Sequence, residues 1–261
     1  MKILFIGDIV GRIGRRMIKD YLPGLIEKYN IDFVIANGEN ASHGKGLLRH
    51  HYLELIDSGI DVITLGNRYD SKKDLRGYID RVDRLIRPLN LVNEYPGEGS
   101  AVFDVNGVSV RVTNLLGSAF MKEEVNNPYY ALMEYLDAVE DQSTIHIIDF
   151  HAEATGEKVC FGYALDGKAS AVLGTHTHVQ TRDYRILEGG TAFISDVGMT
   201  GLYDGALGFD KNTVVSKLMY GNQVKFDIPN EGKGVFSAVV LDIDEISGKC
   251  IEIFPIYQIE K

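Results

Sequence analysis

The sequence predicts an α/β protein in which a parallel β-sheet is covered by helices. In the first third of the chain, short apolar runs alternate with amphipathic stretches of helical periodicity, in the order β-α-β-α-β. Consecutive strands joined in this way lie parallel, and the connecting helices pack on the sheet. A second observation is the hairpin signal Asn106-Gly107 between alternating apolar residues, which makes the sheet system mixed.

The elements of the first third follow from its apolar runs and turn residues. Residues 2–7 form an apolar run that ends at a turn, which is typical of a buried parallel strand. A helix is predicted over residues 12–29, and Pro23 is expected to kink it or to start a second helix. The other elements predicted here are strands at 33–36 and 61–65 and helices at 47–58, ending before Gly59, and 70–81.

The rest of the chain predicts mainly strands. The hairpin occupies residues 101–112, and later apolar runs predict strands at 144–150, 170–173, 191–195, 235–241 and 251–256. No repeat, low-complexity tract or linker divides the chain. Since 261 residues suffice for one large core, we expect a single domain over residues 1–261.

The composition excludes several classes of protein. A hydrophobic share of 45% and a charged share of 25% are ordinary for a globular protein and argue against disorder. The net charge of −10 repels long phosphate backbones, so a duplex DNA partner is not expected. The two cysteines lack CxxC spacing, which excludes the usual thiolate zinc and redox motifs. The N-terminal apolar run is too short for a signal peptide or membrane span, so we expect a cytoplasmic protein without membrane association.

Polar residues of metal-ligand type follow five of the predicted strands. In open α/β sheets the ligand crevice lies at the carboxyl ends of the strands, so residues far apart in sequence converge there. The set consists of Asp8, Glu39, Asn40, Asn67, His151, His176 and His178. Oxygen and imidazole ligands in this mixture suit iron, manganese, zinc or cobalt.

Seven ligands exceed the needs of one tetrahedral site, and Glu39 can bridge two ions about 3.5–4 Å apart. Such a pair of ions can bind a phosphate group and lower the pKa of a bridging water. The sequence therefore predicts a phosphoesterase in which a metal-bridging hydroxide attacks the phosphorus in line.

Single members of this set also fit ordinary structural roles. Asp8 and Asn67 each fit a turn, and His151 alone fits a buried core histidine. The run Gly-Thr-His-Thr-His at 174–178 favours a metal site, because two histidines two residues apart are uncommon at a strand end. His43 and Lys45 lie in a glycine-rich loop after the acidic residues, where they fit substrate binding and a flexible polar loop equally well.

Five motifs in order along nearly the whole chain resemble one family. They are Gly-Asp at 7–8, Asn-Gly-Glu-Asn at 37–40, Gly-Asn at 66–67, Asp-Phe-His-Ala-Glu at 149–153 and Gly-Thr-His-Thr-His-Val at 174–179. Together with Ser-Asp-Val-Gly-Met-Thr-Gly at 195–201, they resemble the YmdB-like branch of the calcineurin-like metallophosphoesterases. The resemblance implies a four-layer α-β-β-α sandwich with mixed sheets.

The resemblance also implies a ligand set, a substrate class and a metal. One ion would be held by Asp8, Glu39, Asn40 and His178, and the other by Glu39, Asn67, His151 and His176. Members of this branch are described as phosphodiesterases that act on 2′,3′-cyclic nucleotides with iron or manganese, and as linked to RNA-related regulation in bacteria. They tend to self-associate, so the resemblance also implies a homo-oligomer.

The sequence departs from the family pattern at position 68. The family has a histidine there that gives a proton to the leaving oxygen, whereas this chain has Arg68. An arginine stays protonated near neutrality and cannot act as that acid, although its planar fork can clamp a phosphate. Loss of a general acid typically costs roughly 10²–10⁴-fold in rate, so we expect weakened or altered diesterase activity.

Two other functions stay open on the sequence. Arg68 is also compatible with a non-catalytic or regulatory protein that keeps the metal site and binds a nucleotide or protein. A metal-dependent amide or phosphomonoester hydrolase would use the same ligand types.

Overall fold

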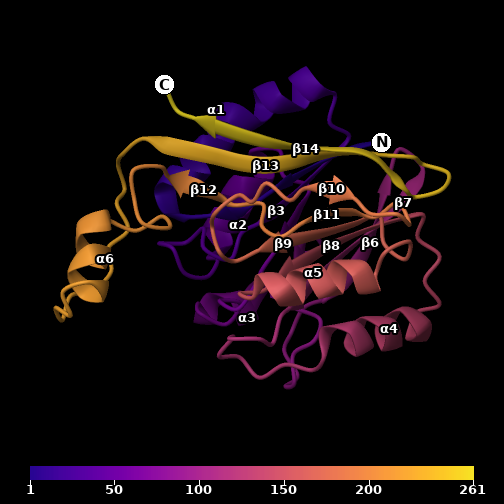
Figure 1. Ribbon diagram of the computed structural model, residues 1–261, viewed down its shortest axis with the longest axis horizontal. Helices are drawn as coiled ribbons and strands as arrows, with labels where there is room; N and C mark the ends of the chain where they lie inside the picture. The colour runs from indigo at the N-terminus through magenta and orange to yellow at the C-terminus, as the bar shows by residue number, and fades with distance from the viewer.

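The computed structural model describes residues 1–261 and contains two β-sheets (Figure 1). The eight-stranded first sheet contains β1 (Lys2–Ile6), β2 (Asp8–Ile9), β3 (Phe33–Asn37), β4 (Val62–Thr64), β5 (Leu85–Ile86), β12 (Met199–Leu202), β13 (Gly234–Ile243) and β14 (Cys250–Ile259). The six-stranded second sheet contains β6 (Ser100–Val105), β7 (Val108–Leu116), β8 (Ile145–His151), β9 (Ala171–Thr175), β10 (Arg185–Ile186) and β11 (Ala192–Ile194).

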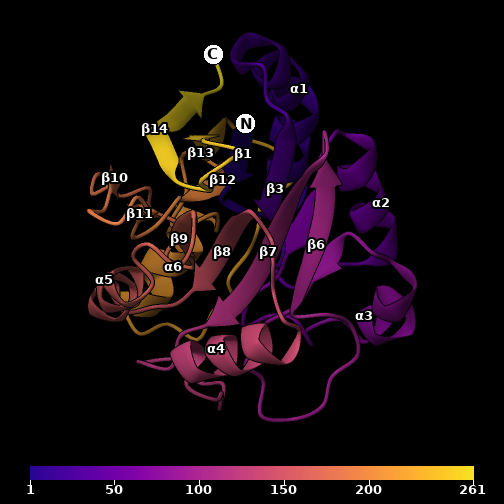
Figure 2. The same ribbon diagram turned by 90° about the vertical axis from the view of Figure 1, so that its right-hand side faces the viewer.

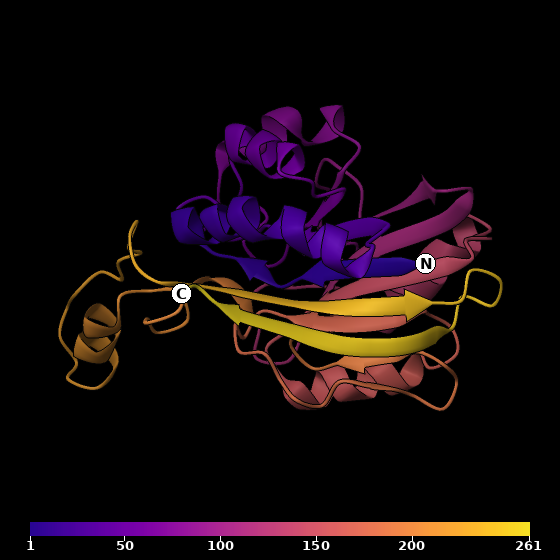
Figure 3. The same cartoon turned by 90° about the horizontal axis from the view of Figure 1, so that it is seen from above.

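The helices lie outside the two sheets. They are α1 (Gly11–Tyr29), α2 (Arg49–Asp57), α3 (Lys73–Tyr78), the short 3₁₀ helix η1 (Ile79–Arg81), α4 (Pro128–Ala138), α5 (Thr155–Ala164) and α6 (Lys211–Leu218). Figure 2 shows α1 to α3 on one side and α4 and α5 on the other. Figure 3 shows α6 set apart from the layers at one end of the molecule. No helix is both long and apolar enough to cross a bilayer.

Three buried hydrophobic clusters separate the four layers. The first joins α1 and α2 to the outer face of the first sheet and contains Ile13, Leu55 and Val34. The second fills the space between the sheets and contains Phe5 from β1 and Ile147 from β8. The third packs α4 and α5 on the second sheet. This arrangement confirms the predicted α-β-β-α sandwich with mixed sheets.

Parallel strands bring the chemical residues to one edge of the sandwich. In the first sheet β1, β3, β4 and β5 run parallel, and in the second β7, β8, β9 and β11 do. Carboxyl ends of parallel strands meet at the same edge. The loops after β1, β3, β4, β8 and β9 therefore converge there.

The local predictions are confirmed with three corrections. The hairpin is present, with Asn106 at φ 54° and Gly107 at φ 85°, as a tight two-residue turn requires. Pro23 does not start a second helix, since α1 runs without interruption from Gly11 to Tyr29 with Pro23 inside it. The helix predicted over 70–81 is shorter and ends in η1, and the sequence reading did not identify α4, α5 or α6.

Candidate metal centre

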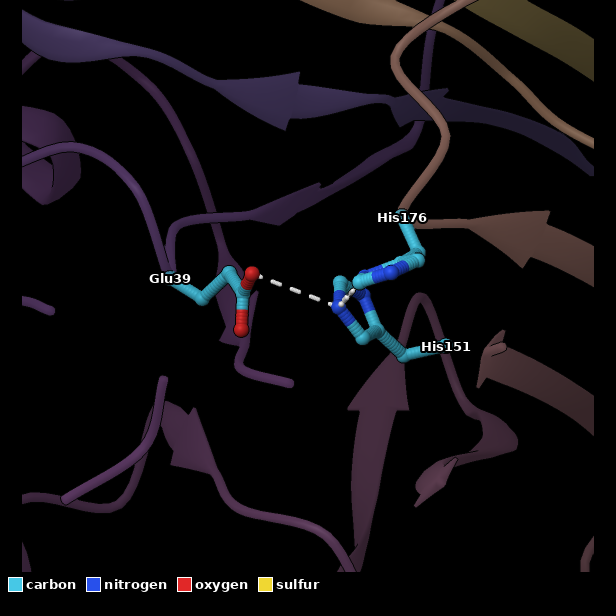
Figure 4. A group of neighbouring side chains, drawn as sticks. All are labelled: Glu39, His151 and His176. Carbon is cyan, nitrogen blue, oxygen red and sulfur yellow. Dashed lines mark hydrogen bonds and ion pairs between the residues drawn. The ribbon is translucent and has the colours of Figure 1, made fainter. Parts of the chain in front are cut away.

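The candidate centre forms around His151, the last residue of β8. Its Nε2 atom lies 3.3 Å from Glu39 Oε1, 3.0 Å from His176 Nδ1 and 3.2 Å from Asn67 Oδ1. Figure 4 shows Glu39 facing the two histidines from the opposite wall. The ligand atoms of Glu39, His151 and His176 all lie within 4.8 Å of one another. A cation placed between them could be bound by all three side chains.

The other predicted ligands, Asp8, Asn40 and His178, lie close to one another beside Glu39. Asp8 Oδ1 is 3.7 Å from His178 Nε2, and the Asn40 amide nitrogen is 3.3 Å from the same His178 atom. That amide also donates to Glu39 Oε1 at 3.0 Å, which connects the two halves of the cluster. In a loaded site the Asn40 amide would turn its oxygen to the cation, which its side chain allows.

The donor set fits two cations in its chemistry. Two carboxylates, two amides and three imidazoles offer hard and borderline ligands for first-row metals. The space between them is reserved by Gly66, where an added methyl group would lie 2.5 Å from Glu39 Oε2 and His151 Nε2. The residues present therefore fit the dinuclear site that the sequence predicts, although their role as ligands stays a prediction.

Burial and charge set the protonation of this cluster. Burial raises the pKa of Asp8, and the histidines His178 and His151 only partly offset this. Burial also disfavours the charged forms of Glu39 and His151, but their pairing outweighs it: the pKa of Glu39 falls to about 2 and that of His151 rises to about 9. Metal binding would have to displace the second proton of His151, the one on Nε2. Binding would therefore depend on pH.

A buried hydrogen-bond chain fixes the tautomer of His151. Thr175 Oγ1 donates to Asp149 Oδ1 at 2.6 Å, so the hydroxyl must accept from His151 Nδ1, 2.8 Å away. Nε2 is then left to face the cluster. Asp149 also accepts from Asn37 at 2.9 Å and Thr64 at 2.5 Å, and burial raises its pKa to about 6. Supporting bonds of this kind orient metal-binding histidines.

A buried ion pair holds the loop that carries the other two histidines. His176 and His178 have φ angles of 104° and 67°, which non-glycine residues rarely adopt. Between them, the Thr177 backbone N–H and hydroxyl donate to Asp196 Oδ2 at 2.9 and 2.8 Å. Lys158, from α5, donates to the same Asp196 atom and to the Thr175 carbonyl, each at 2.8 Å. These hydrogen bonds with buried Asp196 and Lys158 hold the loop in its conformation.

The predicted residues outside the donor cluster lie on its rim. The backbone N–H of Arg68 donates to Glu39 Oε2 at 2.8 Å, while its side chain lines a cavity together with His43 and Lys45. No interaction joins the side chains of these three residues to the donors. Their contact with substrate stays a prediction.

Sequence reasoning missed several residues that contact the candidate ligands. Glu123 accepts from Asn67 at 3.3 Å, and Glu153 lies 2.9 Å from His176 Nε2. Asp149 and Asp196 stand inside the motifs quoted above, but only the fold reveals their partners. Lys158 had no sequence signal, because a lysine on an amphipathic helix is normally exposed.

A four-layer sandwich of this kind, with carboxylate, amide and imidazole side chains at its strand ends, defines the calcineurin-like fold class. The chain matches the family model described as YmdB-like protein over residues 4–256. It belongs to the YmdB-like family.

Related proteins match almost the whole chain. It is 47% identical to a 2′,3′-cyclic-nucleotide 2′-phosphodiesterase of Bacillus subtilis, over 97% of this chain and 95% of that protein. Its fold is similar to that of a hypothetical protein of Thermus thermophilus, with TM-score 0.93, 37% identity and 100% coverage of both chains. A phosphatase of Mycoplasma pneumoniae also matches at TM-score 0.93 and 37% identity, over 100% of this chain and 94% of that one.

Proposed function

We propose that this protein is a dinuclear-metal phosphodiesterase that hydrolyses small phosphodiesters, with 2′,3′-cyclic nucleotides as its substrates. The single observation that carries the proposal is the convergence of Glu39, Asn67 and His176 on His151 Nε2, at 3.3, 3.2 and 3.0 Å. The 47% identical relative named as a 2′,3′-cyclic-nucleotide 2′-phosphodiesterase supports the substrate class.

The metal assignment follows the donor positions. Asp8, Glu39, Asn40 and His178 would hold one ion, and Glu39, Asn67, His151 and His176 the other. The resemblance to the YmdB-like branch favours iron or manganese among the first-row metals that suit these donors. Two such ions supply charge for the phosphate and an activated water. The protein orients the His151 ring through its hydrogen bond with Thr175. It also holds the Glu39 carboxylate next to both groups of donors.

Arg68 would bind the substrate phosphate instead of donating a proton. Arg68 is one of the residues that line a cavity at the rim, and its backbone N–H donates to Glu39. A guanidinium offers a fixed fork of donors to phosphate oxygens but cannot act as an acid near neutrality. Without a general acid, substrates with poor leaving groups should react slowly.

The test compares the native protein with Arg68→His on two substrates. With Mn²⁺ or Fe²⁺, the variant should hydrolyse 2′,3′-cyclic AMP faster, by up to roughly 10²–10⁴-fold, because it regains a proton donor. Bis(p-nitrophenyl) phosphate has a good leaving group and should gain much less. An unchanged rate on cyclic AMP, or equal gains on both substrates, would contradict the role given to position 68.

A second candidate function is nucleotide binding without turnover, and Arg68 is the observation that favours it. In that case the native protein would bind 2′,3′-cyclic AMP at micromolar concentration with negligible hydrolysis under any metal.

We also take residues 1–261 as one domain, because β13 lies between β1 and β12 in the same sheet. The cytoplasmic location and the homo-oligomer stay predictions.

A further inference from the structure

A second feature of the site is a cavity of about 530 Å³ beside the candidate metal centre. Arg68 links the two, since its backbone binds Glu39 at 2.8 Å and its side chain lines the cavity. The loop with Lys45 follows the Asn40 ligand position and forms part of the same wall. Anything bound there would lie next to a substrate on the metals.

The cavity is strongly cationic in a protein of net charge −10. Its lining includes Arg12, Lys45, Arg68 and Lys225, against one acidic residue, Asp227. The ion pairs in the structure involve other arginines and lysines, and none reaches these four side chains. Cations gathered without acidic partners create a local field that attracts an anion.

Aromatic rings stand beside these cations. Phe209 and Phe226 line the same cavity, with their ring centroids 5.5 Å apart. Lys217 Nζ lies 4.7 Å from the centroid of the Phe226 ring, which adds a further cation at the margin. Cationic and aromatic side chains together are the usual means of binding single-stranded nucleotides, through phosphate contacts and base stacking.

Two separate parts of the chain build the cavity. One wall comes from the first turn of α1 and the loops after β3 and β4, and the other from the segment around α6, which stands apart from the layers in Figures 1 and 3. The two walls touch at Gly44, where an added Cβ would collide with Ile228 Cδ1. This close approach at a φ of +69° fixes the spacing between Lys45 and the segment that carries Lys225.

We propose that this cavity binds a second phosphate group, the one on the 5′ side of the nucleoside that carries the cyclic phosphate. The inference rests on the proposed phosphodiesterase function and narrows its substrate class. That phosphate belongs either to a nucleotide with a 5′-phosphate or to the last linkage of a short single-stranded oligonucleotide. In the oligonucleotide, the preceding base would stack on the phenylalanine pair.

The test uses three substrates with Mn²⁺: adenosine 2′,3′-cyclic phosphate, the same compound with a 5′-phosphate, and the dinucleotide ApA that ends in a 2′,3′-cyclic phosphate. Each exposed ion pair should increase substrate affinity by a factor of roughly 1.5–5. Because several cations of the cavity can contact the second phosphate, that phosphate should raise kcat/KM about tenfold. The gain should shrink in 1 M salt, where the screening length is about 3 Å. A further gain for the dinucleotide identifies the oligonucleotide, and equal gains identify the 5′-nucleotide.

Variants assign the effect to the cavity. Lys225→Met and Lys45→Met should each lower the preference for the second phosphate by roughly 1.5–5-fold. Lys19→Met is the matched control, because Lys19 is an exposed lysine of α1 outside the cavity, and it should leave the preference unchanged. Equal kcat/KM for all three substrates in the native protein would overturn the inference.

A binding measurement separates this inference from the proposed function. By calorimetry, adenosine 3′,5′-bisphosphate should bind about tenfold more tightly than adenosine 3′-monophosphate, and Lys225→Met should reduce that ratio. Failure of every substrate to react, with the binding ratio intact, rejects the diesterase function but keeps the phosphate site. Hydrolysis of the cyclic mononucleotide with equal binding of both ligands rejects the phosphate site alone.

Discussion

Lys158 and Asp196 form an ion pair at 2.8 Å in which both side chains are at most 2% exposed. The pair lies under the loop that carries His176 and His178, and Asp196 holds that loop through Thr177. Buried ion pairs are expensive to break, because removing one partner leaves the other charge without compensation. This pair therefore connects the stability of the protein with the geometry of its candidate metal centre.

We expect Lys158→Met to destabilise the protein by about 3–5 kcal/mol, since it leaves Asp196 buried and unpaired. Lys211→Met is the matched control, because Lys211 and Asp204 form an exposed pair at 2.7 Å. Its loss should cost less than about 1 kcal/mol. Urea unfolding of the three proteins measures both values, and similar losses for the two variants would contradict this reading.

Gly66→Ala should damage the centre without unfolding the protein. The added methyl group would lie 2.5 Å from Glu39 Oε2 and His151 Nε2, so the ligand side chains must move apart. Gly77→Ala, in α3, meets no atom within 4 Å and should be neutral or stabilise the helix by up to about 1 kcal/mol. Bound Mn²⁺, measured by elemental analysis after gel filtration, should fall in the first variant only.

Glu39→Gln should weaken binding of both metal ions, because Glu39 is the residue between the two halves of the cluster. In the native protein, Mn²⁺ at about a hundred times its Kd should add about 2.7 kcal/mol of stability, and a chelator should remove it. The variant should gain much less from the same Mn²⁺. Glu134→Gln, on the exposed side of α4, should respond like the native protein. A full response in Glu39→Gln would rule out the bridging role.

His146 should make stability depend on pH. It is buried in β8, shares a hydrogen bond of 2.8 Å with Thr113, and burial lowers its pKa to about 4. An unfolded histidine titrates near 6.5, so between about pH 6.5 and 4 the unfolded state binds the extra proton. Stability from the neutral ring is present above about pH 6.5 and lost as pH falls, by on the order of 3 kcal/mol. His146→Gln should show a smaller loss over this range in urea titrations, and an equal loss would contradict the assignment.

Most of the sheet framework could be predicted from apolar runs, because buried parallel strands leave a clear sequence signal. The same signal failed for α6, whose side chains are all at least partly exposed, so no apolar stripe marks it. Pro23 does not begin a second helix, because the packing of α1 on the first sheet outweighs one missing hydrogen bond. Local propensity yields to tertiary packing in such cases.

The candidate ligands could be predicted because each follows a strand and strand ends converge. The supporting residues could not, because their roles depend on contacts across long sequence distances. Thr64 meets Asp149 across 85 residues, and the cavity brings Arg12 near Lys225 only through the fold. Arg68 was predictable only in part. The sequence showed that it replaces a histidine of the family pattern, but not that it lies between the candidate centre and the cavity.

The placement of β13 sets the order in which the molecule can be completed during synthesis. This strand pairs with β1 on one side and β12 on the other, and β2, which begins at Asp8, pairs only with β12. Contacts that join the first and last parts of a chain form late, because the intervening polypeptide must be made first. Asp8 and Glu39 are synthesised more than 100 residues before the histidines that they contact in the folded protein. The proposed donor set can therefore be complete only after residues 151–178 have been made, and the sheet behind Asp8 only after β13 has paired.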